Sequence, residues 1–459
     1  MKSKLEQLRD FKKELDLISP TFCVAKWKQV TMHLESGLTH SCHHPKAHTV
    51  PFDELDENVS SLHNTKYKKR MREAMLNGEV VAECEYCNRV ERHSKGDGKG
   101  SSYSDRVFKS HDNWARKYIP EILENPPDYD VFPSYFEVSF SSACNCACIY
   151  CSSTFSSGWQ KEIEKYGPYD HLSISSRSFN DAPPPRFPIS NENPYVKAFW
   201  KWWPDLYENL EVFRITGGEP LLSNNTFKIL DYIINKPRPE LSIEVNSNLC
   251  VNKKLVNKFI EKASRISQNQ LINVYTSCEA KGEKAEYIRS GLNYNEWFEN
   301  CRMFLSKVPN SRINMMCTYN ILSVTSFTDF LKDILRLKRE FPQRVYVDIP
   351  TLMNPPYLQA NILTKNFTEH IKESINFMYS AIDIDYWPPL CGNGFYEWEI
   401  SKLIRIYNQF MGRPTHDGLI QQRIDFKGFV DEHDRRYNKN FLATFPEYFD
   451  FYNYCKEMK

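Results

Sequence analysis

Four cysteines lie within eight residues in the segment CNCACIYC, positions 144 to 151. If Cys146 is set aside, Cys144 is followed by three residues, Cys148, two more residues and Cys151. Thiolates are the ligands that iron-sulfur clusters require. Three thiolates on one short loop can hold three irons of a cubane and leave the fourth iron open to another molecule. The spacing therefore indicates a ligand-binding metal centre, with a zinc knuckle as the alternative.

A second, more dispersed set of cysteines lies earlier in the chain. Cys23 is followed by thirteen residues, Gly37, four residues and Cys42, and the segment CEYC supplies Cys84 and Cys87. Four thiolates in two pairs suit a closed site, either an iron-sulfur cubane or tetrahedral zinc. The nearby histidines of HHPKAH could also bind zinc, but we expect this segment to form a solvated loop.

Strand and helix patterns surround the first cysteine group. The alternating run at 135–142 predicts a strand that leads into the cysteines, and the residues from Ser157 predict a helix after them. Helical patterns such as 252–266 alternate with further predicted strands, which lie within 211–222 and at 242–248, 272–278, 312–318 and 345–350. Six strands alternating with helices predict an α/β fold with a partial parallel (β/α)6 barrel, in which ligands bind at the carboxyl ends of the strands.

The stretch EVFRITGGEPLL contains a second group of residues suited to ligand binding. Gly217 and Gly218 let the backbone approach a ligand closely. Glu219 can form a charge-assisted hydrogen bond to an amino group. An ordinary tight turn at the end of a strand would use the same residues, so the stretch is informative only together with the cysteine loop.

Cys144, Cys148, Tyr150 and Cys151 resemble the signature of the radical S-adenosylmethionine (SAM) superfamily, in which an aromatic residue precedes the last of three cysteines. The resemblance implies a [4Fe-4S] cluster whose open iron binds the amino and carboxylate groups of SAM. It also implies that the GGEP stretch holds the methionyl amine. The expected reaction is reductive cleavage of SAM to a 5'-deoxyadenosyl radical, which then takes a hydrogen atom from a substrate.

The same resemblance suggests further cofactor contacts. Asn248, Ser277 and Arg289 fall where contacts to the ribose and carboxylate of SAM are expected. Arg289 could instead be a plain surface or ion-pairing arginine. No residue of the substrate chemistry itself can be identified.

The spacing of Cys23, Gly37 and Cys42 resembles the SPASM and twitch modules that carry auxiliary clusters in radical enzymes. It implies a second [4Fe-4S] cluster, held by these two cysteines together with Cys84 and Cys87. Such modules usually follow the barrel, so the order is reversed here. The combination resembles twitch-domain radical SAM proteins.

The expected domain organisation follows from these assignments. A Gly/Ser/Lys-rich linker at 93–104 marks a boundary, and the proline-rich stretch at 167–194 predicts a loop that either borders the substrate or is an insert. The expected segments are an amphipathic helix at 1–20, a twitch-like module at 21–104, a connecting helix at 105–130, the partial barrel at 131–355 and a helical closure at 356–459.

Composition restricts the possible partners. The 59 basic and 58 acidic residues give a net charge of +1, so nucleic acid is not indicated. The first eighteen residues predict an amphipathic helix and not a signal peptide, and no apolar run is long enough to span a membrane. We expect a cytoplasmic protein whose 14 cysteines are thiols or metal ligands.

The sequence therefore predicts a radical SAM enzyme whose substrate is a peptide or protein side chain. A small metabolite such as a sugar or nucleotide is the alternative substrate. The resemblance implies an electron donor such as flavodoxin or ferredoxin. A non-catalytic zinc-binding interaction protein is the alternative from another class.

Overall fold

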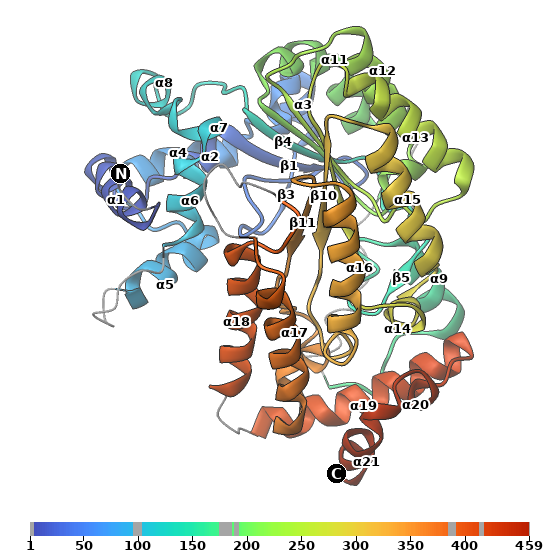
Figure 1. Cartoon of the computed structure of the whole chain (residues 1–459). Coiled ribbons are helices and arrows are strands. Elements are labelled where there is room, and N and C mark those ends of the chain that lie inside the picture. The colour runs from blue at the N-terminus through green and yellow to red at the C-terminus, as the bar shows by residue number, and fades with distance from the viewer. Residues whose placement is uncertain are drawn as a thin grey trace. The chain divides into compact units, whose positions relative to one another are not determined.

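The computed structural model describes residues 4–94, 103–173, 186–187, 192–383, 392–412 and 417–458 (Figure 1). Contacts divide the chain into two compact units. Unit 1 comprises Met1–Ser141, Pro185–Gly217 and Pro239–Glu244, and unit 2 comprises Ser142–Pro184, Gly218–Arg238 and Val245–Lys459. Most of the loop expected at 167–194 lies outside the described residues, and so does Cys391.

Unit 1 contains three parallel strands, β1 (Gln29–His33), β4 (Tyr135–Ser139) and β6 (Val212–Thr216). Two short strands, β2 (Leu38–His40) and β3 (His48–Thr49), add antiparallel to β1 and give the order β3-β2-β1-β4-β6. The strands expected at 135–142 and within 211–222 are confirmed, whereas β1, β2 and β3 were not expected.

Rows of buried side chains fix the register of the parallel strands. Val30 pairs with Phe136, which in turn pairs with Phe213, and all three side chains are fully buried. A slip of one residue would turn this row to the opposite face of the sheet, so burial holds the strands in place. The ends of β4 and β6, where the chemistry-bearing segments begin, are thereby fixed within unit 1.

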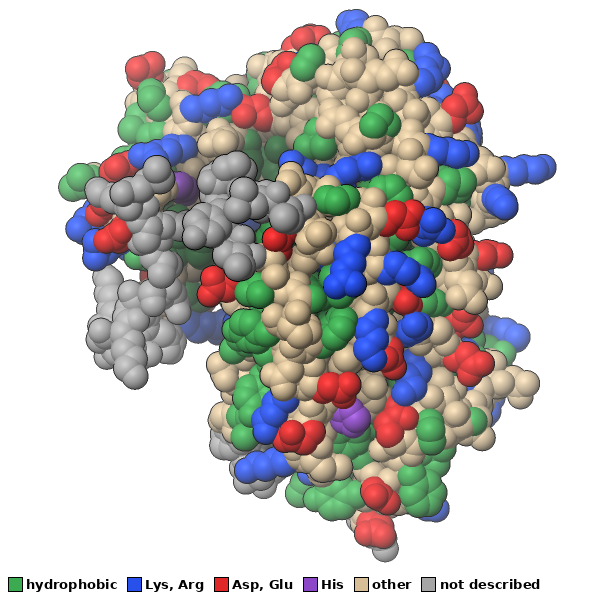
Figure 2. Space-filling view, in the orientation of Figure 1, with side chains coloured by type: hydrophobic (Ala, Val, Ile, Leu, Met, Phe, Trp, Pro, Cys, Tyr) green, Lys and Arg blue, Asp and Glu red, His purple; other side chains and the backbone are tan. Residues whose placement is uncertain are grey.

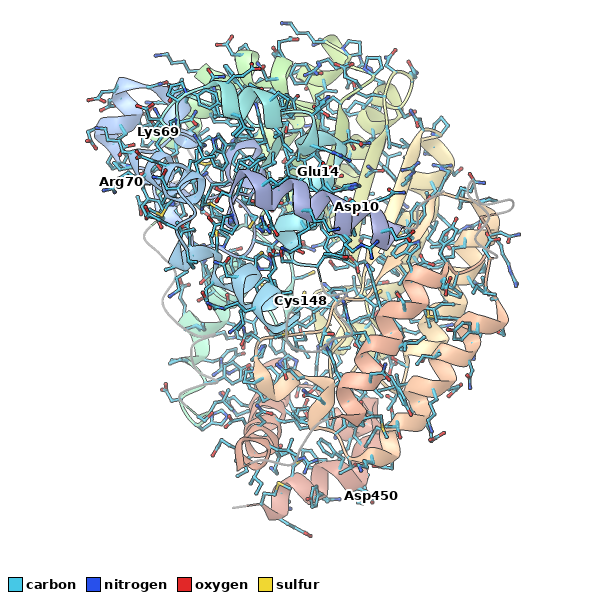
Figure 3. All side chains as sticks on the ribbon, turned by 90° about the vertical axis from the view of Figure 1, so that its left-hand side faces the viewer. Asp10, Glu14, Lys69, Arg70, Cys148 and Asp450 are labelled. Carbon is cyan, nitrogen blue, oxygen red and sulfur yellow. The ribbon has the colours of Figure 1, made fainter. Side chains whose placement is uncertain are left out.

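Helix α1 (Lys4–Ile18) is amphipathic, as the sequence predicts. Phe11 and Leu15 are buried in the core of unit 1. Asp10 and Glu14 lie one turn apart elsewhere on the helix surface (Figure 3). The helix thus packs one apolar stripe, and charged residues on its other faces form ion pairs, such as Glu14 with Arg116.

In place of the single connecting helix expected at 105–130, the chain forms three short helices, α6 (Asp105–His111), α7 (Asn113–Arg116) and α8 (Ile119–Glu124). Asp112 has an extended backbone that ends α6, and Pro120 sits at the start of α8, where proline is tolerated. The other helical elements of unit 1 are α2 (Ala25–Lys28), α3 (Phe52–Glu57), η1 (Val59–Leu62), α4 (Lys66–Leu76), η2 (Ala82–Cys84), α5 (Glu85–Ser94) and α11 (Pro194–Asn209).

Unit 2 contains the parallel strands β8 (Ile272–Ser277), β10 (Ser311–Met316) and β11 (Val345–Asp348), while β7 (Ser242–Asn246) straddles the boundary between the units. These strands confirm the four expected between 242 and 350. The helices that alternate with them are α9 (Ser157–Tyr166), α12 (Asn224–Asn235), α13 (Lys253–Ile266), α14 (Glu283–Ile288), α15 (Tyr294–Lys307) and α16 (Phe327–Glu340). The fold is therefore mixed α/β with parallel strands at its core.

The last hundred residues of unit 2 are mainly helical. Helices α16, α17 and α18 lie side by side (Figure 1). A buried ion pair joins two of them, because Lys338 Nζ on α16 lies 3.0 Å from both carboxylate oxygens of Glu399 on α18. The C-terminal elements are α17 (Thr368–Ser380), α18 (Glu397–Met411), α19 (Asp417–Tyr437), α20 (Phe441–Thr444) and α21 (Phe449–Glu457).

The surface shows no block of one charge on the face in view. Lys and Arg side chains are interspersed with Asp and Glu across the described residues of that face (Figure 2). Among the described residues, no helix combines the length and apolar character needed to cross a bilayer.

Candidate functional site

The cysteine loop, defined here as residues 142–156, is shaped by its own backbone and by one short strand pair. Within it, β5 (Ala147–Cys148) pairs antiparallel with β9 (Arg289–Ser290), so that Cys148 lies opposite Arg289. The loop also closes on itself, since Cys151 N donates to the carbonyl oxygen of Cys148 at 2.9 Å. The Trp159 indole on α9 donates to the same carbonyl at 2.8 Å. The loop is therefore fixed by hydrogen bonds that meet at the Cys148 carbonyl, in the middle of the cysteine triple.

Burial keeps the thiols of this loop protonated when nothing binds them. It raises the pKa of Cys144 to about 11 and that of Cys151 to about 12. The pKa of Cys146 is raised furthest, by burial and by the charges of Cys148 and Cys144. Thiols of this kind become thiolates when a metal cation replaces the proton, because the cation supplies the charge that stabilises them.

The Gly217-Gly218 turn after β6 requires glycine at both positions. Gly217 has a φ of +126°. A Cβ on Gly218 would lie 2.4 Å from the carbonyl oxygens of Ser142 and Ala143, which are backbone atoms of the cysteine loop. Next to it, Glu219 N donates to the Ala143 carbonyl at 2.7 Å. In unit 2, therefore, the GGEP turn and the cysteine loop are in direct backbone contact.

The Glu219 carboxylate is buried and held by three hydrogen bonds. Oε1 accepts from Ser247 Oγ at 2.8 Å and from Leu221 N at 3.0 Å, and Oε2 accepts from Asn248 N at 2.7 Å. Burial raises the pKa of Glu219 to about 7, and these hydrogen bonds oppose the rise. The carboxylate thus exchanges its proton near neutral pH while its position stays fixed.

Asn248 links the end of β7 to the cysteine loop. Its side-chain Nδ2 donates to Asn145 Oδ1 at 2.8 Å and lies 3.6 Å from Cys146 Sγ. Ser277 is the last residue of β8 and is half-buried at the carboxyl end of that strand. Of the two predicted cofactor contacts, Asn248 is therefore hydrogen-bonded to the cysteine loop, whereas Ser277 lies at the end of β8.

Arg289 is buried in an ionic cluster, and its main partner was not anticipated from the sequence. Its Nη2 and Nε lie 2.6 and 3.1 Å from Glu279 Oε2, and the same oxygen accepts from Tyr150 OH at 3.1 Å. Arg289 Nη1 lies 3.4 Å from Cys148 Sγ. The arginine therefore joins the acid, the tyrosine and a cysteine of the loop.

Glu279 retains one unused oxygen. The residue is 1% exposed, and its Oε1 is buried with no hydrogen-bond partner among the described residues. Buried polar atoms are almost always paired, so an orphaned carboxylate oxygen in a site marks a place for a hydrogen-bond donor of a ligand. The signal in the sequence was an acid two residues after Ser277, at the end of a predicted strand.

An open hollow in unit 2 borders the cysteine loop. Its volume is about 490 Å³, and residues 145–147 of the loop line it together with Glu286, Ser290, Tyr437 and Lys439. Cys146, the cysteine set aside in the predicted ligand set, is among these lining residues. The hollow is within the usual size range of ligand sites.

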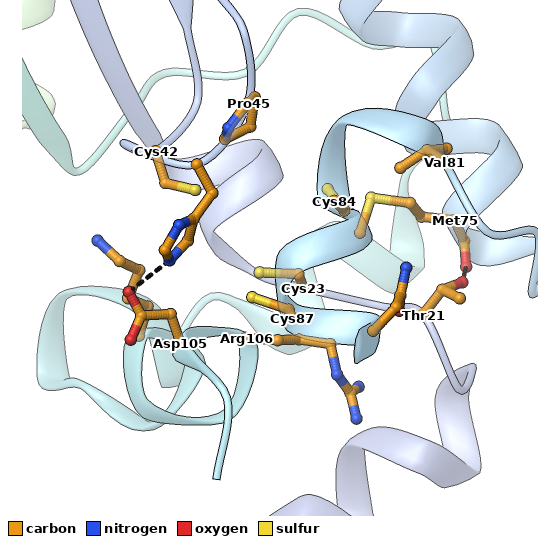
Figure 4. A pocket seen from close by; sticks show the side chains of 13 residues that line it. Thr21, Cys23, Cys42, Pro45, Met75, Val81, Cys84, Cys87, Asp105 and Arg106 are labelled. Atoms are coloured by element: carbon orange, nitrogen blue, oxygen red, sulfur yellow. Dashed lines mark hydrogen bonds and ion pairs between the residues drawn. The ribbon is translucent and has the colours of Figure 1, made fainter. Parts of the chain in front are cut away.

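The second group of cysteines converges on one cavity in unit 1 (Figure 4). Cys23 lies between α1 and α2, Cys42 follows β2, Cys84 ends η2, and Cys87 is on α5. Burial raises the pKa of Cys84 to about 11 and of Cys87 to about 12. Four cysteines from three separate segments of the chain therefore line one cavity.

The backbone conformation at Gly37 explains why a glycine lies between Cys23 and Cys42. It has a φ of +69°, in the left-handed region, at the turn between β1 and β2. Its N–H donates to the His33 carbonyl at 2.8 Å and its carbonyl accepts from Val50 N at 2.9 Å. The turn carries the chain from β1 into β2 and on to Cys42.

The histidine segment is not simply a solvated loop. His43 is exposed, but His44 lines the four-cysteine cavity, and both donate to Asp105 Oδ2 at 3.1 and 3.0 Å. His48 points elsewhere and lies 3.0 Å from Thr65 Oγ1. The expectation of a solvated loop is wrong for His44, because Asp105 on α6 holds its ring against the cavity.

No protein-family model and no curated protein matches this sequence. Two solved structures of SuiB from Streptococcus suis are similar to the chain. SuiB bound to S-adenosylmethionine has a TM-score of 0.36 and 11% identity, over 77% of this chain and 70% of SuiB. SuiB bound to the precursor peptide SuiA has a TM-score of 0.35 and 12% identity, over 82% and 72%. Scores this low assign neither a site nor a function.

Proposed function

We propose that this chain is a radical SAM enzyme. The observation that carries the proposal is the backbone contact between the cysteine loop and the GGEP turn, in which Glu219 N donates to the Ala143 carbonyl at 2.7 Å. Two sequence features 65 residues or more apart are thus joined in one small site. Because β4 and β6 are paired in parallel, the segments that follow them meet at one edge, and the support for the proposal is that these two segments are the cysteine loop and the GGEP stretch.

Cys144, Cys148 and Cys151 would hold three irons of a [4Fe-4S] cluster and leave the fourth for the amino and carboxylate groups of SAM. When bound, the cluster and SAM would supply the one-electron chemistry that yields a 5'-deoxyadenosyl radical. The reducing electron would come from a donor such as flavodoxin or ferredoxin. The reaction outcome after hydrogen abstraction is set by the substrate.

The chain's own residues would bind and orient the cofactor. Gly218 allows the close approach of the turn, and the fixed Glu219 carboxylate would accept a hydrogen bond from the methionyl amine. Asn248 and Ser277 would contact the ribose and carboxylate. Arg289 would orient Tyr150 and stabilise the Cys148 thiolate by its positive charge.

We assign Cys23, Cys42, Cys84 and Cys87 to a closed auxiliary [4Fe-4S] cluster, because four thiolates are the ligands that such a cluster requires; tetrahedral zinc is the alternative.

The proposed architecture is a partial (β/α)6 barrel with an auxiliary module of the twitch type before it. The parallel strands β4 and β6 in unit 1, and β8, β10 and β11 in unit 2, follow one another in chain order with helices between them. The helices after residue 356 would close the barrel. The auxiliary cluster would transfer electrons or brace the substrate side.

The proposed substrate is a peptide or protein side chain. The open hollow beside residues 145–147 would admit a side chain of a larger molecule to the cysteine loop. A small metabolite would be expected to need a more enclosed pocket.

Metal and sulfide analysis after anaerobic purification tests the proposal. About eight iron and eight sulfide per chain are expected for two cubane clusters. Two zinc ions without sulfide would refute the enzyme assignment and support a zinc-binding interaction protein.

A further inference from the structure

Helix α4 in unit 1 buries two positively charged side chains. Lys68 is 1% exposed and Arg72 is fully buried, one turn further along the same face. Lys69 and Arg70, labelled in Figure 3, follow Lys68 in the sequence but are half-buried and exposed. The helix therefore directs Lys68 and Arg72 inward and Arg70 outward.

The inward cations have neutral partners. Lys68 Nζ lies 3.3 Å from Thr39 Oγ1 and 3.3 Å from His63 Nδ1. Arg72 donates to Asn64 Oδ1 at 2.9 Å and to the Lys26 carbonyl at 3.3 Å. Within the described part of the chain, neither cation forms an ion pair with a carboxylate. A buried charge without an opposite charge is strongly unfavourable.

Both cations contact segments that carry cysteines of the four-cysteine cavity: Lys68 contacts Thr39, and Arg72 contacts the Lys26 carbonyl. Thr39, the partner of Lys68, lies on β2 three residues before Cys42. Burial lowers the pKa of Lys68, and the only group that opposes this fall is Cys42. A thiolate at Cys42 would thus be the counter-charge that Lys68 lacks.

A third cation is anchored to the same segments. Lys26 lies three residues after Cys23 and is 3% exposed. It forms an ion pair with Glu83, the residue before Cys84. Burial lowers the Lys26 pKa, and the charges of Cys84, Cys42 and Cys23 all act to raise it. Of these three buried cations, Lys26 is the one that has a carboxylate partner among the described residues.

We propose that Lys68, together with Lys26, provides positive charge that neutralises a four-thiolate metal centre at Cys23, Cys42, Cys84 and Cys87. Four thiolates carry more negative charge than a [4Fe-4S] core or a zinc ion neutralises, and reduction of a cluster adds one more electron. The buried cations are positioning residues that raise the reduction potential of the auxiliary cluster. This inference rests on the proposed function only in requiring that these cysteines bind a metal centre.

If Lys68 is a counter-charge, its replacement should have an effect that replacement of an ordinary structural lysine would not have. With the centre bound, removal of the Lys68 charge should be harmful. Without the centre, the same removal should be neutral or stabilising, because it eliminates an uncompensated buried charge. The sign of the effect therefore depends on occupancy of the cysteines.

The test uses the full chain with Cys144, Cys148 and Cys151 replaced by alanine, so that only the auxiliary cluster contributes a signal. A redox titration followed by electron paramagnetic resonance compares this parent with Lys68→Met. We expect the ratio of reduced to oxidised cluster at a fixed potential to fall at least tenfold, a shift of about 59 mV to more negative potential. Lys68→Arg, which keeps the charge, should change the ratio less than threefold.

Two control variants distinguish loss of the Lys68 counter-charge from the effects of removing any charge or any buried lysine. Arg70→Met removes a charge from the exposed face of the same helix and should leave the ratio unchanged. After removal of iron, Lys68→Met should unfold at the same or a higher urea concentration than the parent. Lys338→Met, which breaks the buried pair with Glu399, should unfold at a lower one.

Distinct outcomes overturn the inference and the proposed function. If Lys68→Met matches Arg70→Met in the titration, or destabilises the iron-free chain as Lys338→Met does, the counter-charge role is refuted while the cluster stands. If the parent holds zinc, the iron cluster is refuted, and the counter-charge then predicts that Lys68→Met loses zinc to a chelator at least tenfold faster. A parent that binds no metal refutes both.

Discussion

Replacement of Glu219 by glutamine tests the contact between the GGEP turn and the cofactor. The change is nearly isosteric and removes the negative charge from a side chain that is 2% exposed. A hydrogen bond to a charged group contributes about 1.5 to 3 kcal/mol. At about 1.4 kcal/mol per factor of ten, SAM should bind about 10 to 100 times more weakly to Glu219→Gln.

The pH dependence makes the test more specific. Burial raises the pKa of Glu219 to about 7, so the side chain is mostly protonated at pH 6 and mostly ionised at pH 8. Only the ionised form can accept the charge-assisted hydrogen bond, and a proton must leave before SAM binds at low pH. The ratio of the SAM affinity of the native chain to the SAM affinity of Glu219→Gln should therefore rise about tenfold from pH 6 to pH 8.

The assay is an equilibrium titration of SAM into the anaerobic protein with both clusters intact, as checked by iron content. Ionisation of the SAM amine affects binding to both proteins equally, so the ratio of their SAM affinities reports only the ionisation of Glu219. Glu261→Gln, an exposed acid on α13, is the control for loss of a charge and should bind SAM normally. Unchanged affinity in Glu219→Gln, or a ratio that stays flat with pH, would refute the assigned contact.

Three further predictions follow from the same geometry. Cys146→Ala should retain normal iron content and SAM cleavage, because Cys146 lines the open hollow; loss of the cluster in Cys146→Ala but not in Cys148→Ala would show that the ligand register is wrong. Gly218→Ala should lower the free energy of unfolding by about 1 to 3 kcal/mol in a urea titration, since its Cβ meets two carbonyl oxygens at 2.4 Å, and an unchanged midpoint would contradict the close contact. Glu279→Gln should lower it by about 3 to 5 kcal/mol, because Arg289 would stay buried without its counter-charge; a loss below 1 kcal/mol would mean that the pair is not buried as described.

Local patterns were sufficient to predict the strands that lead into the site. The run at 135–142 and the four strands between 242 and 350 alternate or cluster apolar residues over the length of a strand, and that signal does not depend on distant contacts. The same is true of α1 and α9. The observed strands end one to three residues before the predicted ends.

Features that depend on long-range pairing were missed. β1 alternates polar and apolar residues but is only five residues long, and what defines it as a strand is its pairing with β4 more than 100 residues later. Glu279 becomes informative only when folding brings it to Arg289 and Tyr150. The buried position of Lys68 has no local signal either, because its neighbours Lys69 and Arg70 are equally basic.

The most direct test of the account is the amount of 5'-deoxyadenosine formed when the anaerobically reconstituted chain is reduced in the presence of SAM. The native chain should form it in excess over a Cys148→Ala variant, which should form none while keeping about four irons at its auxiliary site. A native chain that carries both clusters but forms no 5'-deoxyadenosine, or an equal yield from Cys148→Ala, would contradict the assignment of this chain as a radical SAM enzyme.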